Sequence, residues 1–389
     1  MIGALAFRSP PDRSPEPSIT LHRSIGDVPR DQWDAMAGDD VLASHGWLLT
    51  LERTRCGDAT PLYVVARTAG RVVGGAAVAR MCATDLIETV DHVLLGRLRP
   101  LAARIGISFL PALVAAPLRG FGCLPLASRE LDEGARGRVL DALLDAIEAE
   151  AARQGGALFF GDLRPCHADL AARLAARAFI DALDDPVSVL DVRWDSFDAY
   201  LRHLDRVSRG ARKDVRRQQN QNRKRGTTIT AEDDAGRTGD RLWQLMTLNE
   251  RAHNRRPFGF VRDFFPVLTR ELPGDAVVYA ARKQGRITAT SLLLRRGTTG
   301  YLPMVGVDHA AAGRDFTFFA IAHYRPIADA IAGGLRTLYF GRALDGLKAR
   351  RGCRLEETRV FLRARAPIGR LASRPWLRVL SSWNRVKRA

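Results

Sequence analysis

One lysine in the C-terminal part of the chain lies among arginines in a way that favours the stabilisation of negative charge. Lys348 follows Arg342 and is close to Arg350 and Arg351 in the stretch YFGRALDGLKARRG. A lysine near such cations would stabilise an oxygen that gains negative charge in a transition state. A surface lysine in a basic loop is the other interpretation, and both stay open at this point.

Proton transfer requires an acid or a base, and four further residues could supply one. Asp308 and His309 are adjacent and follow a predicted strand, so His309 is a candidate base. His253 lies where a predicted helix passes into a loop. Tyr301 begins the strand before Asp308 and could donate a proton to a leaving group. Structural histidines and a packed strand tyrosine are the alternatives.

A strongly basic helix is predicted over Ser196–Gly226. Ser196 can cap its start, Gly210 is expected to kink or restart it, and Gly226 suits the position after its end. Its apolar stripe is Tyr200, Leu201, Leu204, Val207, Ala211 and Val215. Seven cations fall within roughly a 140° arc of the helix: Arg209, Arg212, Lys213, Arg216, Arg217, Arg223 and Lys224. Like charges at this spacing destabilise a helix unless they are neutralised. We therefore expect phosphates there; a solvated face is the alternative.

The elements that must position these residues belong to a chain long enough for two domains. It has 389 residues, 46% of them hydrophobic, and a formal net charge of +17. The excess of arginine indicates either a polyanionic partner or codon drift in a GC-rich genome. The five scattered cysteines contain no CxxC pair, so neither a zinc site nor a disulfide framework is expected. We expect a cytoplasmic protein.

Two similar hairpins suggest that the chain is internally duplicated. Val277–Val307 reads as three consecutive strands, and Tyr63–Arg80 repeats its first hairpin with the same Gly-Arg turn. Two other pairs occur in the same order: Trp33 and Met36 with Trp243 and Met246, and Gly155-Gly156 before ALFFG with Gly333-Gly334 before TLYFG. Three repeats in order indicate a duplication. The segment Asp85–Leu126 between them is expected to be irregular with short strands.

Each half therefore contains a helix pair, a hairpin, a connecting strand, a helix, Gly-Gly and a strand. This layout resembles the Gcn5-related N-acetyltransferase (GNAT) fold, and two fused halves resemble the Fem-like and BioF2-like acyltransferases. The segments that carry the resemblance are WDAMA and SHGWL after Gln32, SRGARKDVRRQQNQNRKRG within the basic helix, and YFGRALDGLKARRG at Tyr339–Gly352.

The resemblance implies an α/β fold of two tandem GNAT-like domains, each a mixed sheet flanked by helices. The expected segments are a disordered leader at 1–17, domains at 18–190 and 191–365, and a basic amphipathic tail at 366–389. It also implies an enzyme that forms an amide by transferring an acyl or aminoacyl group to an amine, either a small molecule or a cell-envelope precursor. Lys348 occupies the lysine position of the closing motif, and His253 lies in the region that contacts the acceptor.

The acyl donor is the point where the chain departs from the resemblance. GNAT enzymes that use acyl-CoA bind its pyrophosphate in a glycine-rich loop before the long helix. Here Ala310–Phe319 keeps Gly313 beside Arg314 and lacks the second glycine. This departure favours aminoacyl-tRNA over acyl-CoA, and no bound cofactor or metal is expected. Phosphate contacts are assigned to Arg209, Arg212, Lys213, Arg216, Gly313, Arg314 and Arg342.

Two alternatives stay open. One is an acetyl- or acyl-CoA-dependent N-acetyltransferase. The other is a non-enzymatic RNA- or membrane-binding protein built on an inactive duplicate of the fold. The tail at 366–389 interleaves basic residues with Trp376 and Trp383, so it could contact an anionic membrane surface.

Overall fold

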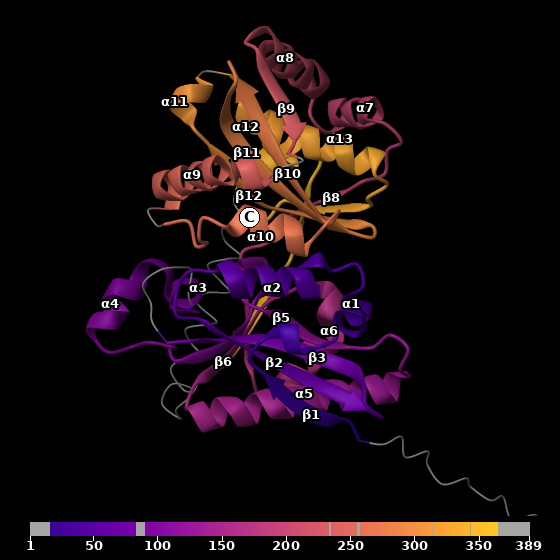
Figure 1. Ribbon diagram of the computed structural model, residues 1–389, viewed down its shortest axis with the longest axis vertical. Coiled ribbons are helices and arrows are strands. Elements are labelled where there is room, and N and C mark those ends of the chain that lie inside the picture. The colour runs from indigo at the N-terminus through magenta and orange to yellow at the C-terminus, as the bar shows by residue number, and fades with distance from the viewer. Residues whose placement is uncertain are drawn as a thin grey trace, which may run out of the picture.

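The computed structural model describes residues 16–82, 90–232, 235–254, 257–313, 315–342 and 344–364. The expected tail at 366–389, nearly all of the leader at 1–17, and Arg314 lie outside these residues. Two mixed sheets, each flanked by helices, are stacked along the long axis of the molecule (Figure 1). This is the predicted α/β architecture.

The first sheet has the strand order β1-β2-β3-β4-β6-β15-β7, with β5 also paired to β3. Its strands are β1 (Ser18–His22), β2 (Thr60–Thr68), β3 (Arg71–Met81), β4 (Ala112–Ala115), β5 (Cys123–Ala127), β6 (Ala157–Leu163), β7 (Ile180–Leu183) and β15 (Arg359–Arg363). Helices α1 (Arg30–Ala37) and α2 (His45–Thr54) cover one face, and α5 (Glu133–Gln154) and α6 (Ala168–Ala176) cover the other. The predicted hairpin over Tyr63–Arg80 is confirmed as β2 and β3.

The segment Asp85–Leu126 is more regular than expected. It contains the predicted short strands β4 and β5, but also helices α3 (Val90–Leu95) and α4 (Arg99–Arg104). Leu94 of α3 is fully buried, and α3 packs against β3 and β4. The frequent prolines in the sequence argued against a helix here. Pro100, however, lies in the first turn of α4, where a proline is tolerated.

The second sheet has the order β14-β8-β13-β12-β11-β10-β9. Its strands are β8 (Val187–Asp191), β9 (Thr227–Ala231), β10 (Ala276–Lys283), β11 (Arg286–Arg296), β12 (Thr299–Val307), β13 (Thr337–Tyr339) and β14 (Arg354–Glu356). The predicted three-stranded meander is confirmed as β10, β11 and β12. Helices α9 (Ala235–Asn254) and α10 (Phe264–Glu271) cover one face. The other face is covered by α7 (Phe197–Val207), α8 (Ala211–Lys224), α12 (Thr317–Phe319), the π-helical turn η6 (Ala320–Tyr324) and α13 (Arg325–Ala332).

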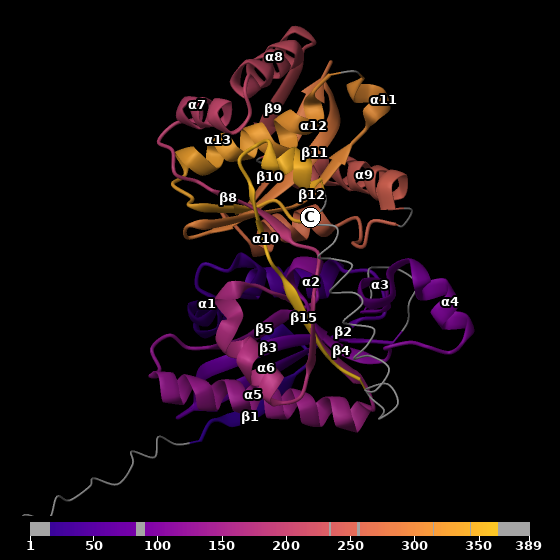
Figure 2. The same cartoon turned by 180° about the vertical axis from the view of Figure 1, so that it is seen from behind.

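The two sheets exchange one strand each. β15, from the C-terminal part of the chain, lies between β6 and β7, whereas β8 lies between β13 and β14. Figure 2 shows β15 in the half of the molecule that contains β2, β3 and β4. Both inserted strands are antiparallel to their neighbours, and both sheets contain one parallel pair at the same position, β4 with β6 and β12 with β13. The sheets therefore share one topology, position for position, as a duplication predicts. Helices α7 and α8 connect the two repeats.

The halves also share an apolar core. Trp47 and Leu51 of α2 pack with Phe264 and Leu268 of α10 in one buried cluster. An ion pair between Arg53 and Glu271 adds a polar contact at 2.6 Å. Within the described residues, no helix is both long enough and apolar enough to cross a bilayer.

Candidate active site

The parallel strands β12 and β13 separate shortly after they meet. They pair over Thr299–Tyr301 and Thr337–Tyr339, and β12 then continues to Val307 without β13 beside it. Gly341 has a φ of 66°, a conformation that suits glycine, and turns the chain away after β13. Along this part of β12, one edge is paired to β11 and the other has no strand partner among the described residues. Such an edge can offer backbone N–H groups to a bound carbonyl or anion.

A cavity of about 280 Å³ lies beside this separation, between the two halves of the molecule. We call it the inter-half cavity. Its wall combines α2, the loop before α10, and the ends of β12 and β13. Five aromatic side chains belong to the lining: Trp47, Phe258, Phe260, Tyr301 and Tyr339. It lies on the face of the second sheet that α9 and α10 cover.

A larger cavity of about 600 Å³ lies on the opposite face of the second sheet. We call it the helical cavity, because α7, α8, η6 and α14 (Asp345–Ala349) surround it. Its lining includes Arg209, Phe319, Tyr324, Arg350 and Arg351. The two cavities thus lie on opposite faces of the second sheet, and the inter-half cavity is the one whose lining includes residues of β12 and β13. This arrangement would let a donor and an acceptor approach one point from opposite sides.

The basic helix is broken where the sequence predicted. Gly210 has a φ of 82° and separates α7 from α8, Ser196 caps α7 through the N–H of Ala199, and Gly226 follows α8 with a φ of 70°. One residue of the predicted apolar stripe was wrong. Val207 is 46% exposed, because it is the last residue of α7 and the chain turns away there.

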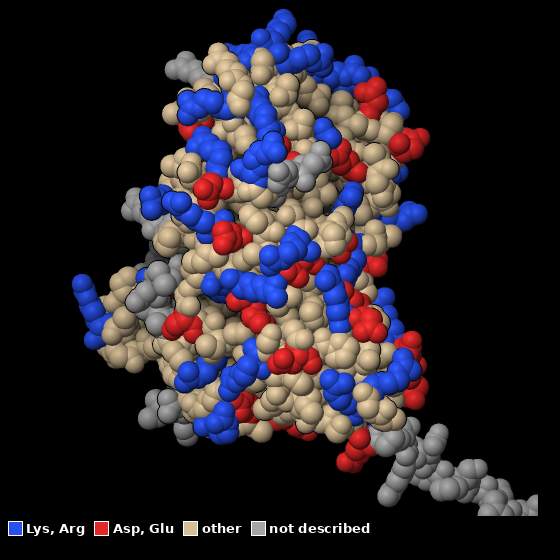
Figure 3. Space-filling view, in the orientation of Figure 1, with Lys and Arg blue, Asp and Glu red and all other residues tan. Residues whose placement is uncertain are grey.

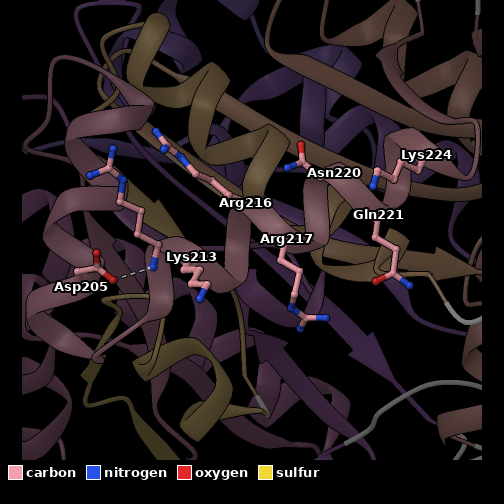
Figure 4. A pocket seen from close by; sticks show the side chains of 8 residues that line it. Asp205, Lys213, Arg216, Arg217, Asn220, Gln221 and Lys224 are labelled. Carbon is pink, nitrogen blue, oxygen red and sulfur yellow. Dashed lines mark hydrogen bonds between the residues drawn. The ribbon is translucent and has the colours of Figure 1, made fainter.

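Most of the predicted cations gather on the outer surface of α8, at the top of Figure 3. A surface hollow there is lined by Asp205, Arg212, Lys213, Arg216, Arg217, Asn220, Gln221 and Lys224 (Figure 4). We call it the α8 groove. Arg216 is paired with Asp198 at 2.9 Å and Arg217 with Asp214 at 2.6 Å. Of the four residues assigned to phosphate binding in this helix, three line the groove and Arg209 lines the helical cavity.

Lys348 is buried, with 5% of its surface exposed. Its ammonium donates hydrogen bonds to three consecutive carbonyls, those of Phe340 at 2.8 Å, Gly341 at 3.1 Å and Arg342 at 3.0 Å. Burial lowers the pKa of Lys348 to about 8, although the three acceptors favour the charged form. In this arrangement Lys348 holds the turn after β13, and it could reach a reacting oxygen only by giving up one of these bonds. Its role in catalysis stays a prediction.

Arg342 belongs to a buried cluster of two arginines and two aspartates. It donates to Asp184 at 2.6 Å and to Asp162, and Arg119 donates to the same two carboxylates at 2.7 and 2.6 Å. Burial alone would raise the pKa of Asp184, but Arg119 and Arg342 lower it to about 2. The charge of Arg342 is therefore balanced within the protein, which weakens the case that it binds a substrate phosphate.

The other predicted acid and base residues lie at two ends of β12. Asp308 caps α11 (His309–Ala312), accepting from Ala311 N–H at 3.1 Å and from Arg241 at 2.9 Å. The exposed rings of His309 and His253 are neighbours, with centroids 6.1 Å apart. Tyr301 is about 23 Å away along the strand. The structure therefore brings His309, Asp308 and His253 together, but apart from Tyr301.

Tyr301 lies at the separation of the strands. Its ring is stacked on Tyr339 with centroids 4.7 Å apart, and the guanidinium of Arg164 lies 4.6 Å from the Tyr339 ring. Burial raises the pKa of Tyr301 well above its usual value, so the phenol stays protonated and could donate. Tyr339 precedes the carbonyls that Lys348 binds. Tyr301 and Lys348 therefore flank the same turn.

The loop after β12 already contains an anion of the protein itself. The Asp315 carboxylate accepts from the N–H and hydroxyl of Thr317 at the start of α12 and pairs with Lys283 at 3.2 Å. The N–H of Phe316 donates to the Asn222 side chain of α8 at 2.9 Å. Gly313, the glycine kept from the glycine-rich loop, has a φ of 71° and precedes Phe316 and Thr317 in the chain. Two N–H groups that a CoA pyrophosphate would need thus have partners.

Several residues of the inter-half cavity escaped the sequence analysis as site residues. Trp47 belongs to the SHGWL motif, which carried the resemblance but was given no role. Arg55, Phe258 and Phe260 follow the ends of helices, and their joint placement depends on contact between the halves. Among the described residues, no group of His, Cys, Asp and Glu is placed to hold a metal ion.

Comparison with known proteins agrees with this architecture. FemX is 15% identical with a TM-score of 0.57, covering 91% of this chain and 99% of that one. The C-terminal domain of a candidate lysylphosphatidylglycerol synthetase from Agrobacterium fabrum is 13% identical with a TM-score of 0.54, covering 92% and 96%. L-PGS from Bacillus licheniformis is 11% identical with a TM-score of 0.53, covering 91% and 97%. At these identities the likeness shows the fold.

No curated protein matches the chain in sequence. The model of a family described as peptidoglycan biosynthesis/recognition matches residues 24–367, which is most of the chain. The protein belongs to the FemAB-like family.

Proposed function

We propose that the protein forms an amide by transferring an aminoacyl group from tRNA to an amine. Membership of the family indicates an acyl- or aminoacyltransferase. The observation that carries the proposal is the separation of β12 from β13 beside the inter-half cavity, with the helical cavity on the other face of the same sheet. We assign the acceptor to the inter-half cavity and the activated acyl group to the helical cavity.

The proposed reaction is aminolysis of an ester. The acceptor nitrogen attacks the carbonyl carbon that joins the amino acid to the tRNA ribose, so a C–N bond forms and the C–O bond to the ribose breaks. The ribose oxygen leaves with one proton, which comes from the amine. Backbone N–H groups on the free edge of β12 would stabilise the negative charge on the carbonyl oxygen. Tyr301 is proposed to relay this proton: its phenol donates to the leaving oxygen and regains a proton from the attacking amine.

Two features support tRNA over acyl-CoA as the donor. Asp315, paired with Lys283, already occupies the N–H of Thr317 at the start of α12, so a CoA pyrophosphate would have to displace this carboxylate. The α8 groove presents Lys213 and Lys224 on an open surface, which suits an extended phosphate backbone. A cytoplasmic site of action follows from this donor. Membrane contact by the tail at 366–389 stays part of the proposal for a lipid-linked acceptor.

The test compares donors directly. Transfer of a labelled group to a panel of amines is measured with charged tRNA and with acetyl-CoA, together with the shift in melting temperature that each donor causes. We expect transfer from charged tRNA and a stabilisation by tRNA that weakens steeply with salt. Stabilisation and transfer with acetyl-CoA alone would sink the tRNA proposal.

A charge-reversal pair locates the tRNA. Lys213→Glu in the α8 groove should weaken tRNA binding about tenfold at low salt and reduce its salt dependence. Arg71→Glu is the matched control, because Arg71 is 75% exposed and lies on the first sheet. Equal losses in both variants would indicate non-specific attraction to a basic protein. Binding of tRNA without transfer to any amine would favour the non-enzymatic alternative.

A further inference from the structure

The inter-half cavity contains a cation that forms no ion pair within the described residues. Arg55 follows α2 and lines the cavity, and within the described part of the chain it makes no ion pair with a carboxylate. Its guanidinium lies 3.4 Å from the centre of the Phe121 ring and donates to the carbonyl of Gly120. Its Nε–H is buried and has no hydrogen-bond partner. Asp58 acts on it only at longer range.

A second buried donor without a partner lines the same cavity. Trp47 is 3% exposed, and its indole Nε1–H has no hydrogen-bond partner among the residues that the structure describes. Buried N–H groups are nearly always paired, so these two donors need an explanation, as does the unpaired Nε–H of Arg342 in the same lining. Buried N–H groups without hydrogen bonds destabilise the unliganded protein. A ligand oxygen that accepts these hydrogen bonds would remove that cost.

The other cations of this wall differ from Arg55. Arg119 and Arg342 also line the cavity, but Asp162 and Asp184 balance their charge. Burial lowers the pKa of Arg55 to about 9, because Cys56 and Asp58 offset only part of the loss of water. The position of Arg55 is fixed from both halves: Cys56 N–H donates to Gly259 carbonyl at 2.9 Å, and Val261 N–H to Thr54 carbonyl at 2.8 Å. The backbone of Arg55 is therefore fixed where the two halves meet.

The remaining lining indicates what else the ligand carries. Aromatic and aliphatic side chains form most of the wall, which suits an apolar or aromatic body. Glu250 adds a carboxylate to the same lining, so the cavity presents both signs of charge. The volume of about 280 Å³ suits a molecule of the size of one large amino acid or a small dipeptide end.

We propose that Arg55 and Trp47 bind a carboxylate of the acceptor, so that the acceptor is an amine that also carries a carboxylate, such as an amino acid or the end of a peptide. This inference rests on the proposed function for the amine alone; the carboxylate subsite stands on the unpaired donors. Arg55 and Trp47 act in positioning, since they hold the acceptor while its nitrogen faces the separation of β12 and β13.

The carboxylate subsite can be tested by ligand binding alone, without an acyl donor. Calorimetric titration of the full chain uses lysine, phenylalanine and the dipeptide Ala-Phe, each paired with its C-terminal amide. We expect each acid to bind more tightly than its amide. Arg55→Met should weaken binding of the acids roughly tenfold to a hundredfold, the effect of removing a charge-assisted hydrogen bond. Trp47→Phe keeps the ring and should weaken it about threefold to tenfold.

The controls separate this subsite from the rest of the site. Arg55→Lys restores charge without the Nε–H geometry and should bind better than Arg55→Met. If Arg55→Met fails to fold, the comparison of acid with amide and the Trp47→Phe variant decide. Equal affinity for acid and amide, no saturable binding of any acid, or tighter binding of phosphoethanolamine would each overturn the carboxylate assignment. Binding of the acids without turnover would instead contradict the proposed function.

Discussion

The first and second sheets have the same topology but differ at the position where a GNAT-like half would open. In the first half, β4 pairs with β6 along its whole length, from Ala112 to Ala115, and every residue of both strands is buried. In the second half, β12 leaves β13 after Tyr301, and Pro303 is exposed. We call the first copy closed, because β4 ends where its pairing with β6 ends. We call the second copy open, because β12 continues beyond its pairing with β13.

The helices that follow these strands differ in the same sense. The first half has one continuous helix, α5, of 22 residues. The second half has short helices interrupted by the π-helical turn η6, which contains the buried His323. Single π-helical turns are frequent at functional sites. The difference indicates that the first copy supplies the scaffold and one wall of the inter-half cavity, while the second copy contains the separation of β12 from β13.

The largest expected effect comes from the cluster that joins the halves. Arg342→Met leaves Asp162 and Asp184 buried with one arginine between them, and we expect a loss of about 3–5 kcal/mol in the free energy of unfolding. Urea denaturation followed by fluorescence measures it. Arg336→Met is the control, because Arg336 is exposed, and should change stability by less than about 0.5 kcal/mol. Equal stability of both variants would show that the cluster is not what couples the two copies.

A core substitution in the closed copy should separate stability from activity. Leu143 of α5 is fully buried against the first sheet, and Leu143→Ala should cost about 3 kcal/mol. Turnover measured well below the melting temperature should stay within about twofold of the wild type, because the first copy serves as scaffold. A loss of turnover in folded Leu143→Ala would mean that the closed copy takes part in the chemistry.

Whether a feature of the fold could be predicted from the sequence depends on how far apart in the chain the interacting residues are. The meander, the break at Gly210 and the cap at Ser196 are set by residues close in the chain, and all three were predictable. The exchange of β8 and β15 was not, because Arg359 pairs with Leu163 and no local pattern encodes so distant a partner.

The candidate site was harder to predict than the fold. The run of arginines around Lys348 suggested an exposed cationic cluster, yet its ammonium faces three carbonyls and Arg342 faces two aspartates. Which way a side chain points depends on tertiary packing. The unpaired donors Arg55 and Trp47 had no signal in the sequence beyond the SHGWL motif, because the lack of a partner can only be observed in a folded structure.

A buried histidine in the open copy should make the protein sensitive to acid. Burial, with Arg351 and Lys348 nearby, lowers the pKa of His323 to about 3, so the folded protein holds it neutral. The unfolded chain binds a proton below about pH 6.5 and the folded chain does not, so stability falls as the pH decreases. Between pH 7 and 5 the wild type should lose about 2 kcal/mol that His323→Phe does not lose. Urea denaturation at both pH values measures the difference; parallel losses would place the acid sensitivity elsewhere.

The smallest effect on stability, with a clear effect on function, is expected at the opening itself. Met304 lines the inter-half cavity and is only partly buried on the stretch of β12 that has left β13. Met304→Trp should fill part of the cavity, with a change in unfolding free energy below about 1 kcal/mol. We expect the KM for the amine to rise about tenfold or more, since a filled cavity excludes the acceptor. Val114→Trp on the fully paired β4 is the matched substitution, and there overpacking should cost about 1–3 kcal/mol or more. If Val114→Trp were tolerated and Met304→Trp unfolded the protein, the assignment of the open and closed copies would be reversed.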